Sequence, residues 1–177
     1  MSDNIIFRPP VANDAAMLAQ FGRDSFCEAF AHLYSAENLT TFLNDVHNIE
    51  NINAQIEANN VHYMLAEDAA DNGKLIGYCK ISEKSKLDYD QNGPHTCEFS
   101  QLYVLASHHG SGVAQKLMDW AIQSAKSRGF KELVLSVYSD NPRAQSFYQK
   151  YGFTYYCDTI FMVGTHRDDE YIYRLIL

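Results

Sequence analysis

Residues 98–114 combine a predicted strand, a glycine-rich turn and the start of a predicted helix. The first N–H groups of a helix have no intrahelical partner, and the helix dipole makes that end positive. Gly110 and Gly112 would let a ligand approach the backbone without meeting a Cβ atom. This combination is typical of a site for a pyrophosphate. The segment therefore predicts that the chain binds a phosphorylated ligand at this turn.

The turn lacks the sequences of two common phosphate-binding loops. A P-loop requires a Lys-Ser or Lys-Thr pair after its last glycine, and no such pair follows the glycines here. Gln115 stands where the dinucleotide-binding pattern G-x-G-x-x-G has its third glycine. A nucleotide-binding protein nevertheless stays open as an alternative, and it would be stabilised thermally by ATP or NAD.

Two further side chains could move protons near this anion site. Glu98 lies on the predicted strand, and a carboxylate with a reference pKa near ~4.3 becomes a better base when burial raises that value. Tyr148 lies on a predicted short helix, and a phenol with a reference pKa near ~10 can donate a proton. The structural alternatives are an edge charge for Glu98 and core packing for Tyr148.

In two segments the sequence resembles the GNAT family of N-acetyltransferases. The run His109-Gly-Ser-Gly112-Val-Ala114 resembles that family's acetyl-CoA motif, Gln/Arg-x-x-Gly-x-Gly/Ala, with His109 in place of Gln or Arg. The run from Asn141 to Phe153 is similar to a second signature, N-x-x-A-x-x-x-Y-x-x-x-G-F. The first motif acts largely through backbone N–H groups. The replacement of its Gln or Arg by His109 therefore has little effect on the resemblance.

This resemblance implies transfer of an acetyl group from acetyl-CoA to a primary amine, by direct attack in a ternary complex. It implies Tyr148 as the acid at the thioester sulfur, Glu98 as the base on the amine, and the Val104 N–H as an oxyanion donor. No metal is expected, because the seven histidines lack ligand spacing. The implied cofactor-binding residues are Leu102, Tyr103, Val104, His109, Gly110, Ser111, Gly112, Val113, Ala114, Asn141, Tyr148 and Lys150.

The acceptor is expected to lie against the first helices and the last two strands. Aromatic and acidic side chains interleave in the first helices, which favours a cationic amine, although core packing also explains most of the aromatic residues. The substrate-binding candidates are His32, Tyr34 and Glu98. Residues 30–39 and 161–175 are similar to a bacterial subgroup that includes spermidine/spermine acetyltransferases, which implies a polyamine.

Other functions stay open beside a polyamine acetyltransferase. The acceptor could be a different small amine, a protein N-terminus or a lysine side chain. A non-catalytic acyl-CoA-binding or regulatory module on the same fold would bind the cofactor without turning over an amine.

Hydrophobic periodicity predicts the elements that position these residues. Helices are predicted over 14–30, 35–46, 49–58, 113–127 and 141–150. Strands are predicted over 5–8, 61–67, 74–83, 96–105, 132–138, 153–163 and 170–177, with a hairpin turn at Asp71-Asn72-Gly73. We therefore expect one α/β domain over residues 1–177, and the resemblance implies a mixed, mostly antiparallel sheet of six to seven strands flanked by helices.

Composition narrows the possible partners and location. The chain has 177 residues and a formal net charge of −8, which disfavours a broad nucleic-acid surface. No apolar run approaches the ~20 residues of a membrane span, and the first ten residues lack a signal-peptide pattern. The four cysteines are scattered, as in a cytoplasmic protein with reduced thiols. Exposed last strands would allow a homodimer through sheet-edge pairing.

Overall fold

The computed structural model describes residues 4–90 and 92–177, whose strands form one sheet in the order β1-β2-β3-β4-β5-β7-β6. Only β4 and β5 pair in parallel. The predicted mixed, mostly antiparallel sheet is therefore confirmed. The strands are β1 (Ile5–Arg8), β2 (Val61–Asp68), β3 (Lys74–Ser82), β4 (Thr96–Val104), β5 (Glu132–Tyr138), β6 (Thr154–Val163) and β7 (His166–Ile176).

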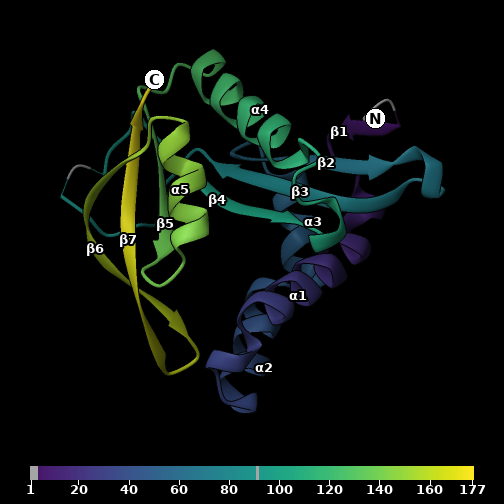
Figure 1. The fold of residues 1–177 in the computed structure, drawn as a ribbon, viewed down its shortest axis with the longest axis horizontal. Helices are drawn as coiled ribbons and strands as arrows, with labels where there is room; N and C mark the ends of the chain where they lie inside the picture. The colour runs from purple at the N-terminus through teal and green to yellow at the C-terminus, as the bar shows by residue number, and fades with distance from the viewer. Residues whose placement is uncertain (1–3, 91) are drawn as a thin grey trace.

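Helices cover both faces of this sheet (Figure 1). They are α1 (Ala15–Phe30), α2 (Ala36–Val46), α3 (Ile49–Glu57), α4 (Val113–Ser127) and α5 (Pro142–Lys150). Leu18 of α1 and Ile52 of α3 share a core with Leu65 of β2, whereas the next residue, Ala66, belongs to a second core with Leu117 of α4. Successive strand side chains point to opposite faces, so α1 and α3 lie on the face opposite α4.

The pairing of β4 with β5 stops after Glu98 and Val134. Beyond that point β4 stays paired with β3 up to Val104, and β5 stays paired with β7 up to Tyr138. Figure 1 shows the consequence, because β2, β3 and β4 run nearly horizontally in this view while β5, β6 and β7 run nearly vertically. A gap between the two halves of the sheet therefore opens directly after Glu98.

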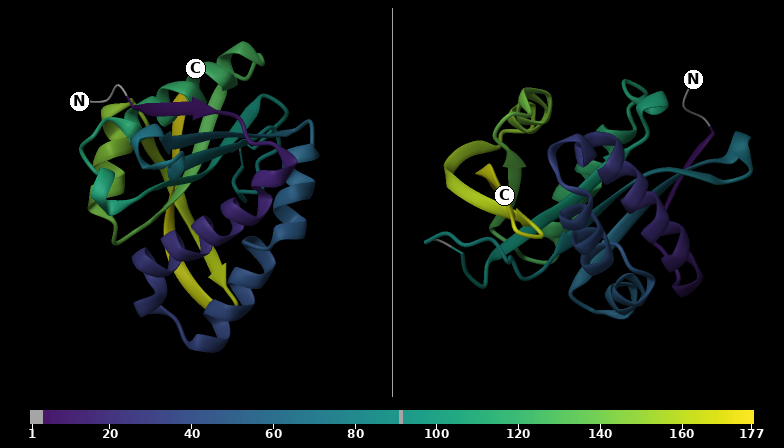
Figure 2. Two further views of the ribbon diagram at one scale, coloured as in Figure 1. Left: turned by 90° about the vertical axis from the view of Figure 1, so that its right-hand side faces the viewer. Right: turned by 90° about the horizontal axis from the view of Figure 1, so that it is seen from below.

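The last hairpin is longer than the sequence predicts. A loop is expected before residue 170, but β7 begins at His166, and the register pairs Val163 with His166 across a tight turn. The prediction missed this part because residues 164–169 are mostly polar. The hairpin tip reaches α2 (Figure 2). There the backbone N–H of Thr165 donates to Asn38 Oδ1 at 2.9 Å. The hairpin and α2 thus close one end of the gap.

His47 lies in the core between α2 and α3, with only 1% of its surface exposed. Its ring contacts those of Phe26, Phe42 and Tyr103. Among the described residues neither ring nitrogen finds a hydrogen-bond partner. Burial, together with the charges of nearby Lys80 and Arg23, lowers the pKa of His47 to about 4.

Acidification is therefore expected to destabilise the fold through His47. An unfolded imidazole has a pKa near ~6.5, so the unfolded chain takes up this proton first. The contribution of neutral His47 to the free energy of unfolding is complete above pH 6.5 and is lost as the pH falls toward 4. Between pH 7 and pH 5 the unfolding free energy should fall by about 2 kcal/mol more in the parent than in His47→Leu. Denaturant unfolding of both proteins at both pH values measures this, and equal losses would contradict it.

Candidate active site

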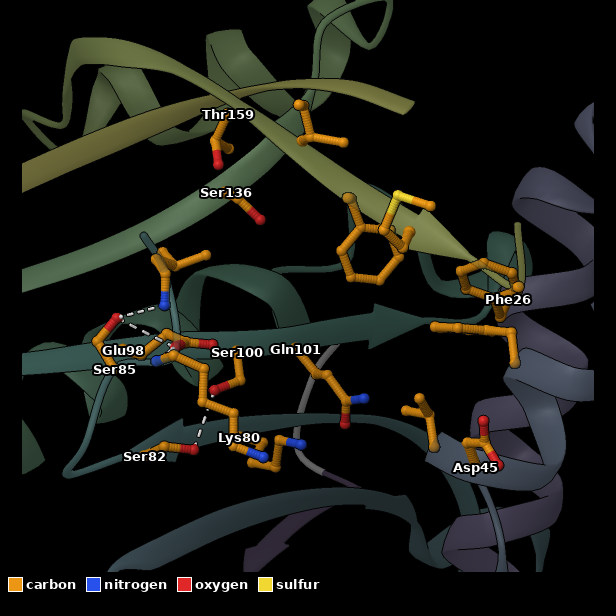
Figure 3. A pocket seen from close by; sticks show the side chains of 18 of the residues that line it. Phe26, Asp45, Lys80, Ser82, Ser85, Glu98, Ser100, Gln101, Ser136 and Thr159 are labelled. Atoms are coloured by element: carbon orange, nitrogen blue, oxygen red, sulfur yellow. Dashed lines mark hydrogen bonds between the residues drawn. The ribbon is translucent and has the colours of Figure 1, made fainter. Parts of the chain in front are cut away.

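Two adjoining clefts occupy the gap in the sheet. The larger, of about 1370 Å³, extends from α2 to the loop after β3. The smaller, of about 210 Å³, lies between β4, β5, β7 and α5. Both clefts share the wall residues Phe26, Ser100, Gln101, Tyr103, Ser136 and Phe161. Figure 3 shows Ser136 and Thr159 facing Ser100 and Gln101 across the larger cleft. A molecule in one cleft can therefore touch a molecule in the other.

The smaller cleft contains a buried carboxylate, that of Glu170 on β7. Among the described residues Glu170 Oε2 has no hydrogen-bond partner. Burial raises the pKa of Glu170, as does the charge of Asp168, and a hydrogen bond with Ser136 lowers it; together these effects give a pKa of about 7. A carboxylate with this pKa and a free oxygen can accept a proton at neutral pH.

Tyr148 lies on the α5 side of the same cleft. Its ring packs against the rings of Phe99, Phe147 and Phe153. Burial raises the pKa of the Tyr148 phenol above its usual value, and the charge of Glu170 raises it further. The phenol thus keeps its proton at neutral pH and can donate it within the cleft.

The turn before α4 presents backbone N–H groups to solvent. Gly110 and Gly112 have φ values of +80° and +90°, and a Cβ atom on either would meet nothing within 4 Å. In the described part of the chain no side chain caps α4. The His109 ring lies 3.0 Å from the Val104 carbonyl oxygen, and Ser111 Oγ donates to the His108 carbonyl at 2.6 Å. Both side chains fold back, which leaves the start of α4 open to an anion.

The free edge of β4 carries donors that face the gap. The N–H of Leu105 donates to the Ile76 carbonyl on β3 at 2.9 Å. Backbone N–H groups alternate in direction along a strand, so those of Val104 and Leu102 point to the opposite edge. Beyond Glu98 that edge has no β5 partner among the described residues. These N–H groups can therefore bond an extended ligand that enters the gap.

Residues 23–153 match the sequence profile described as the acetyltransferase (GNAT) family. The chain belongs to the GNAT family. A curated relative, an uncharacterized N-acetyltransferase of Mycobacterium tuberculosis, is 32% identical over 104 residues. That alignment covers 59% of this chain and 62% of the relative, so the chain spans about three fifths of the length of this relative.

Solved N-acetyltransferase structures share the fold. The PaiA N-acetyltransferase of Thermoplasma acidophilum, crystallised with coenzyme A, is similar with a TM-score of 0.78 and 20% identity, over 98% of this chain and 99% of that chain. The spermidine/spermine N-acetyltransferase SpeG of Vibrio cholerae is similar with a TM-score of 0.66 and 19% identity, over 99% and 94%. At these identities the likeness concerns the fold.

The residues matched to GNAT cofactor binding lie around the smaller cleft and the turn. Leu102, Tyr103, Asn141 and Tyr148 line the cleft. Asn141 Oδ1 also caps α5 by accepting from the Ala144 N–H at 3.1 Å. The second group, His109 to Ala114, forms the turn and the first residues of α4. Lys150 is exposed in the last turn of α5.

Glu98 lies where β4 and β5 part, on the wall of the larger cleft. Its Oε2 accepts from the Lys86 N–H at 2.7 Å and from Ser85 Oγ at 3.2 Å. The carboxylate therefore holds the loop after β3 in addition to facing the cleft. Glu98 is not among the described residues that line the smaller cleft.

The two other substrate candidates differ in position. Tyr34 lines the smaller cleft and donates its phenol proton to Asp168. His32 is exposed and is absent from the described lining of both clefts. Of the acidic residues that interleave the first helices, Glu37 and Asp45 line the larger cleft.

Sequence reasoning missed Glu170 and Lys80, which line the smaller and the larger cleft respectively. Glu170 is the first residue of the predicted strand 170–177 and directly follows Asp168 and Asp169, and this acidic run does not indicate that its side chain enters a cleft. The sequence places Lys80 on the predicted strand 74–83. It does not indicate which face of the sheet the Lys80 side chain occupies.

The described ranges, 4–90 and 92–177, contain neither a metal-binding cluster nor a membrane-spanning helix. No three His, Cys, Asp or Glu side chains there are grouped to hold a metal ion. No helix there is long and apolar enough to span a bilayer.

Proposed function

We propose that the chain transfers an acetyl group from acetyl-CoA to a primary amine. The observation that carries this proposal is the meeting of the two clefts beside Glu170 and Tyr148. One cleft adjoins the residues that match the family's cofactor motifs, and the other is large enough for an acceptor. Both reactants would then be present together, so that the amine attacks directly.

The backbone around the gap fits the cosubstrate. N–H groups at the start of α4 would bind its pyrophosphate, since Gly110 and Gly112 leave open space above them. The free edge of β4 would bond its extended arm through Leu102 and Val104. When bound, acetyl-CoA supplies a thioester whose carbonyl carbon an amine can attack. The Val104 N–H would stabilise negative charge on the carbonyl oxygen.

The base acts on the acceptor amine, and the acid acts on the thiolate that leaves from acetyl-CoA. An alkylammonium with a pKa near ~10.4 must lose its proton before it can attack, and at pH 7 this costs roughly 4.6 kcal/mol. Glu170 would accept that proton, supported by its free oxygen and its pKa of about 7. Tyr148 would give its proton to the departing thiolate. Glu98, acting through water, is the second candidate for the base.

Charged side chains of both signs line the larger cleft, and its carboxylates can match the charge of a small amine. Glu37, Asp45 and Glu98 contribute carboxylates, and Phe26 and Phe42 contribute rings. These residues support a cationic acceptor, including the polyamine that the sequence predicts.

We place the reaction in the cytoplasm, supported by four cysteines that are free thiols. A homodimer through the edge strand β6 is supported by exposed Tyr155 and Met162.

Amine-dependent release of free thiol from acetyl-CoA tests this function. We expect turnover with at least one member of a panel of polyamines, amino acids, aminoglycosides and peptides. Acetyl-CoA should also raise Tm, whereas ATP and NAD should not. Cofactor binding without turnover of any acceptor would instead support a non-catalytic acyl-CoA-binding module.

A further inference from the structure

Lys80 places an ammonium in the larger cleft (Figure 3). Its Nζ lies 3.4 Å from Gln55 Oε1 and 5.9 Å from the centre of the Tyr63 ring. Gln55 Oε1 already accepts a hydrogen bond from Tyr63 Oη at 2.5 Å. Within the described residues no carboxylate oxygen lies within 4.0 Å of Lys80 Nζ. The cation therefore depends on weak neutral contacts.

Two other partly buried cations among the described residues are paired with carboxylates. Arg8 bonds Asp14 and Glu67, and Arg174 bonds Glu132. Burial lowers the pKa of Lys80 to about 8 despite the opposing charge of Glu98. A buried charge without a counter-ion costs stability, and such groups concentrate at functional sites. The missing partner of Lys80 is thus best sought in a ligand.

Gln101 provides a second donor on the same wall. It is the register partner of Lys80 on β4. Tyr78 Oη donates to Gln101 Oε1 at 3.2 Å, which leaves the amide NH₂ group as the end that can donate to a ligand. Next to it, Ser100 Oγ lies 3.0 Å from Ser82 Oγ, also on the cleft wall. An ammonium and an amide NH₂ together suit a carboxylate, which only accepts hydrogen bonds.

We propose that Lys80 and Gln101 form a carboxylate-binding subsite, and that the acceptor carries a carboxylate in addition to its amine, as a free amino acid does. The inference rests on the proposed acetyl transfer. Gln101 belongs to the walls of both clefts, so an acceptor held there by its carboxylate can extend its amine toward Glu170. A polyamine would instead bring a second cation toward Lys80, with mutual repulsion.

Paired acceptors that differ only in the carboxylate test this subsite. Lysine is assayed beside cadaverine, methionine beside 3-(methylthio)propylamine, and phenylalanine beside phenethylamine, with spermidine as the polyamine. We expect kcat/KM for the best amino acid to exceed that of its decarboxylated partner by at least about tenfold. Lys80→Met should raise KM for that amino acid by about 10- to 100-fold with kcat nearly unchanged, and should leave the decarboxylated amine unaffected.

Two further variants separate this role from a structural one. Lys80→Arg retains a cation and should keep the preference for the carboxylate. Lys74→Met removes an exposed lysine from the same strand, where it pairs with Asp71, and should change neither parameter. Because Lys80 is a partly buried cation with no carboxylate partner among the described residues, Lys80→Met should keep or raise Tm.

Three results would overturn the subsite. The first is an equal kcat/KM for the amino acid and its decarboxylated amine in every pair. The second is an equal loss of kcat/KM for both members of a pair in Lys80→Met. In either case acetyl transfer itself would stand. The third is no turnover of any amine, spermidine included, which would overturn the proposed function and the subsite with it.

Discussion

Replacing Glu170 by Gln is expected to lower kcat by about 10²- to 10⁴-fold at pH 7, which is the range that general-base catalysis supplies. An amide of the same shape fills the cleft but cannot accept a proton from the amine. The pKa of Glu170, about 7, also predicts a break in the pH–rate profile of the parent enzyme. In Glu170→Gln that break should disappear, and the residual rate should rise with the fraction of free amine. Steady-state thiol release between pH 5.5 and pH 9 measures both effects.

Glu98→Gln is the matched control for this experiment. Both changes replace a carboxylate on the wall of the gap by its amide, but Glu98 already accepts hydrogen bonds from Lys86 and Ser85. We expect Glu98→Gln to keep the break near pH 7 and most of kcat. If Glu98→Gln alone removes the break while Glu170→Gln retains it, the base is Glu98, as the family resemblance implies.

Tyr148→Phe is expected to lower kcat at least tenfold with little change in the KM for acetyl-CoA. The substitution removes the phenolic O–H that protonates the departing thiolate. It keeps the ring, whose contacts with Phe99, Phe147 and Phe153 hold α5 against the sheet. The loss should therefore concern the chemical step and leave cofactor binding intact. Initial rates over a range of acetyl-CoA concentrations separate the two parameters.

Tyr155→Phe provides the comparison for the loss of one hydroxyl group. Tyr155 is 54% exposed on β6, outside both clefts in the described part of the chain. Its change should leave kcat and Tm nearly unaltered. An unchanged kcat in Tyr148→Phe would remove Tyr148 as the acid, whereas a large drop in Tm would assign it to packing.

Local signals in the sequence were sufficient to predict most elements. The bounds of α4, Val113–Ser127, agree with the prediction, because Gly112 and Gly129 mark its ends and apolar residues recur at helical spacing between them. The turn before it could be recognised as an anion site for the same reason. Helix starts and glycine turns depend on neighbouring residues, so a single sequence carries them.

The base and the acceptor subsite depend on pairing between distant strands. Glu170 enters the gap only because β7 pairs with β5, which places Tyr138 opposite it. Similarly, Lys80 meets Gln55 and Gln101 from α3 and β4. His32, chosen as an aromatic residue near acidic ones, lies exposed in the turn between α1 and α2. Which of these side chains faces a cleft is decided by tertiary packing, which periodicity does not specify.

A crystal structure with coenzyme A bound tests the central claim, that acetyl transfer takes place in the gap between β4 and β5. We predict that the pyrophosphate lies over residues 110–114, that the extended arm bonds Leu102 and Val104, and that the sulfur points to Tyr148. Coenzyme A bound outside this gap, or a gap that stays closed to the sulfur at saturating ligand, would contradict the claim.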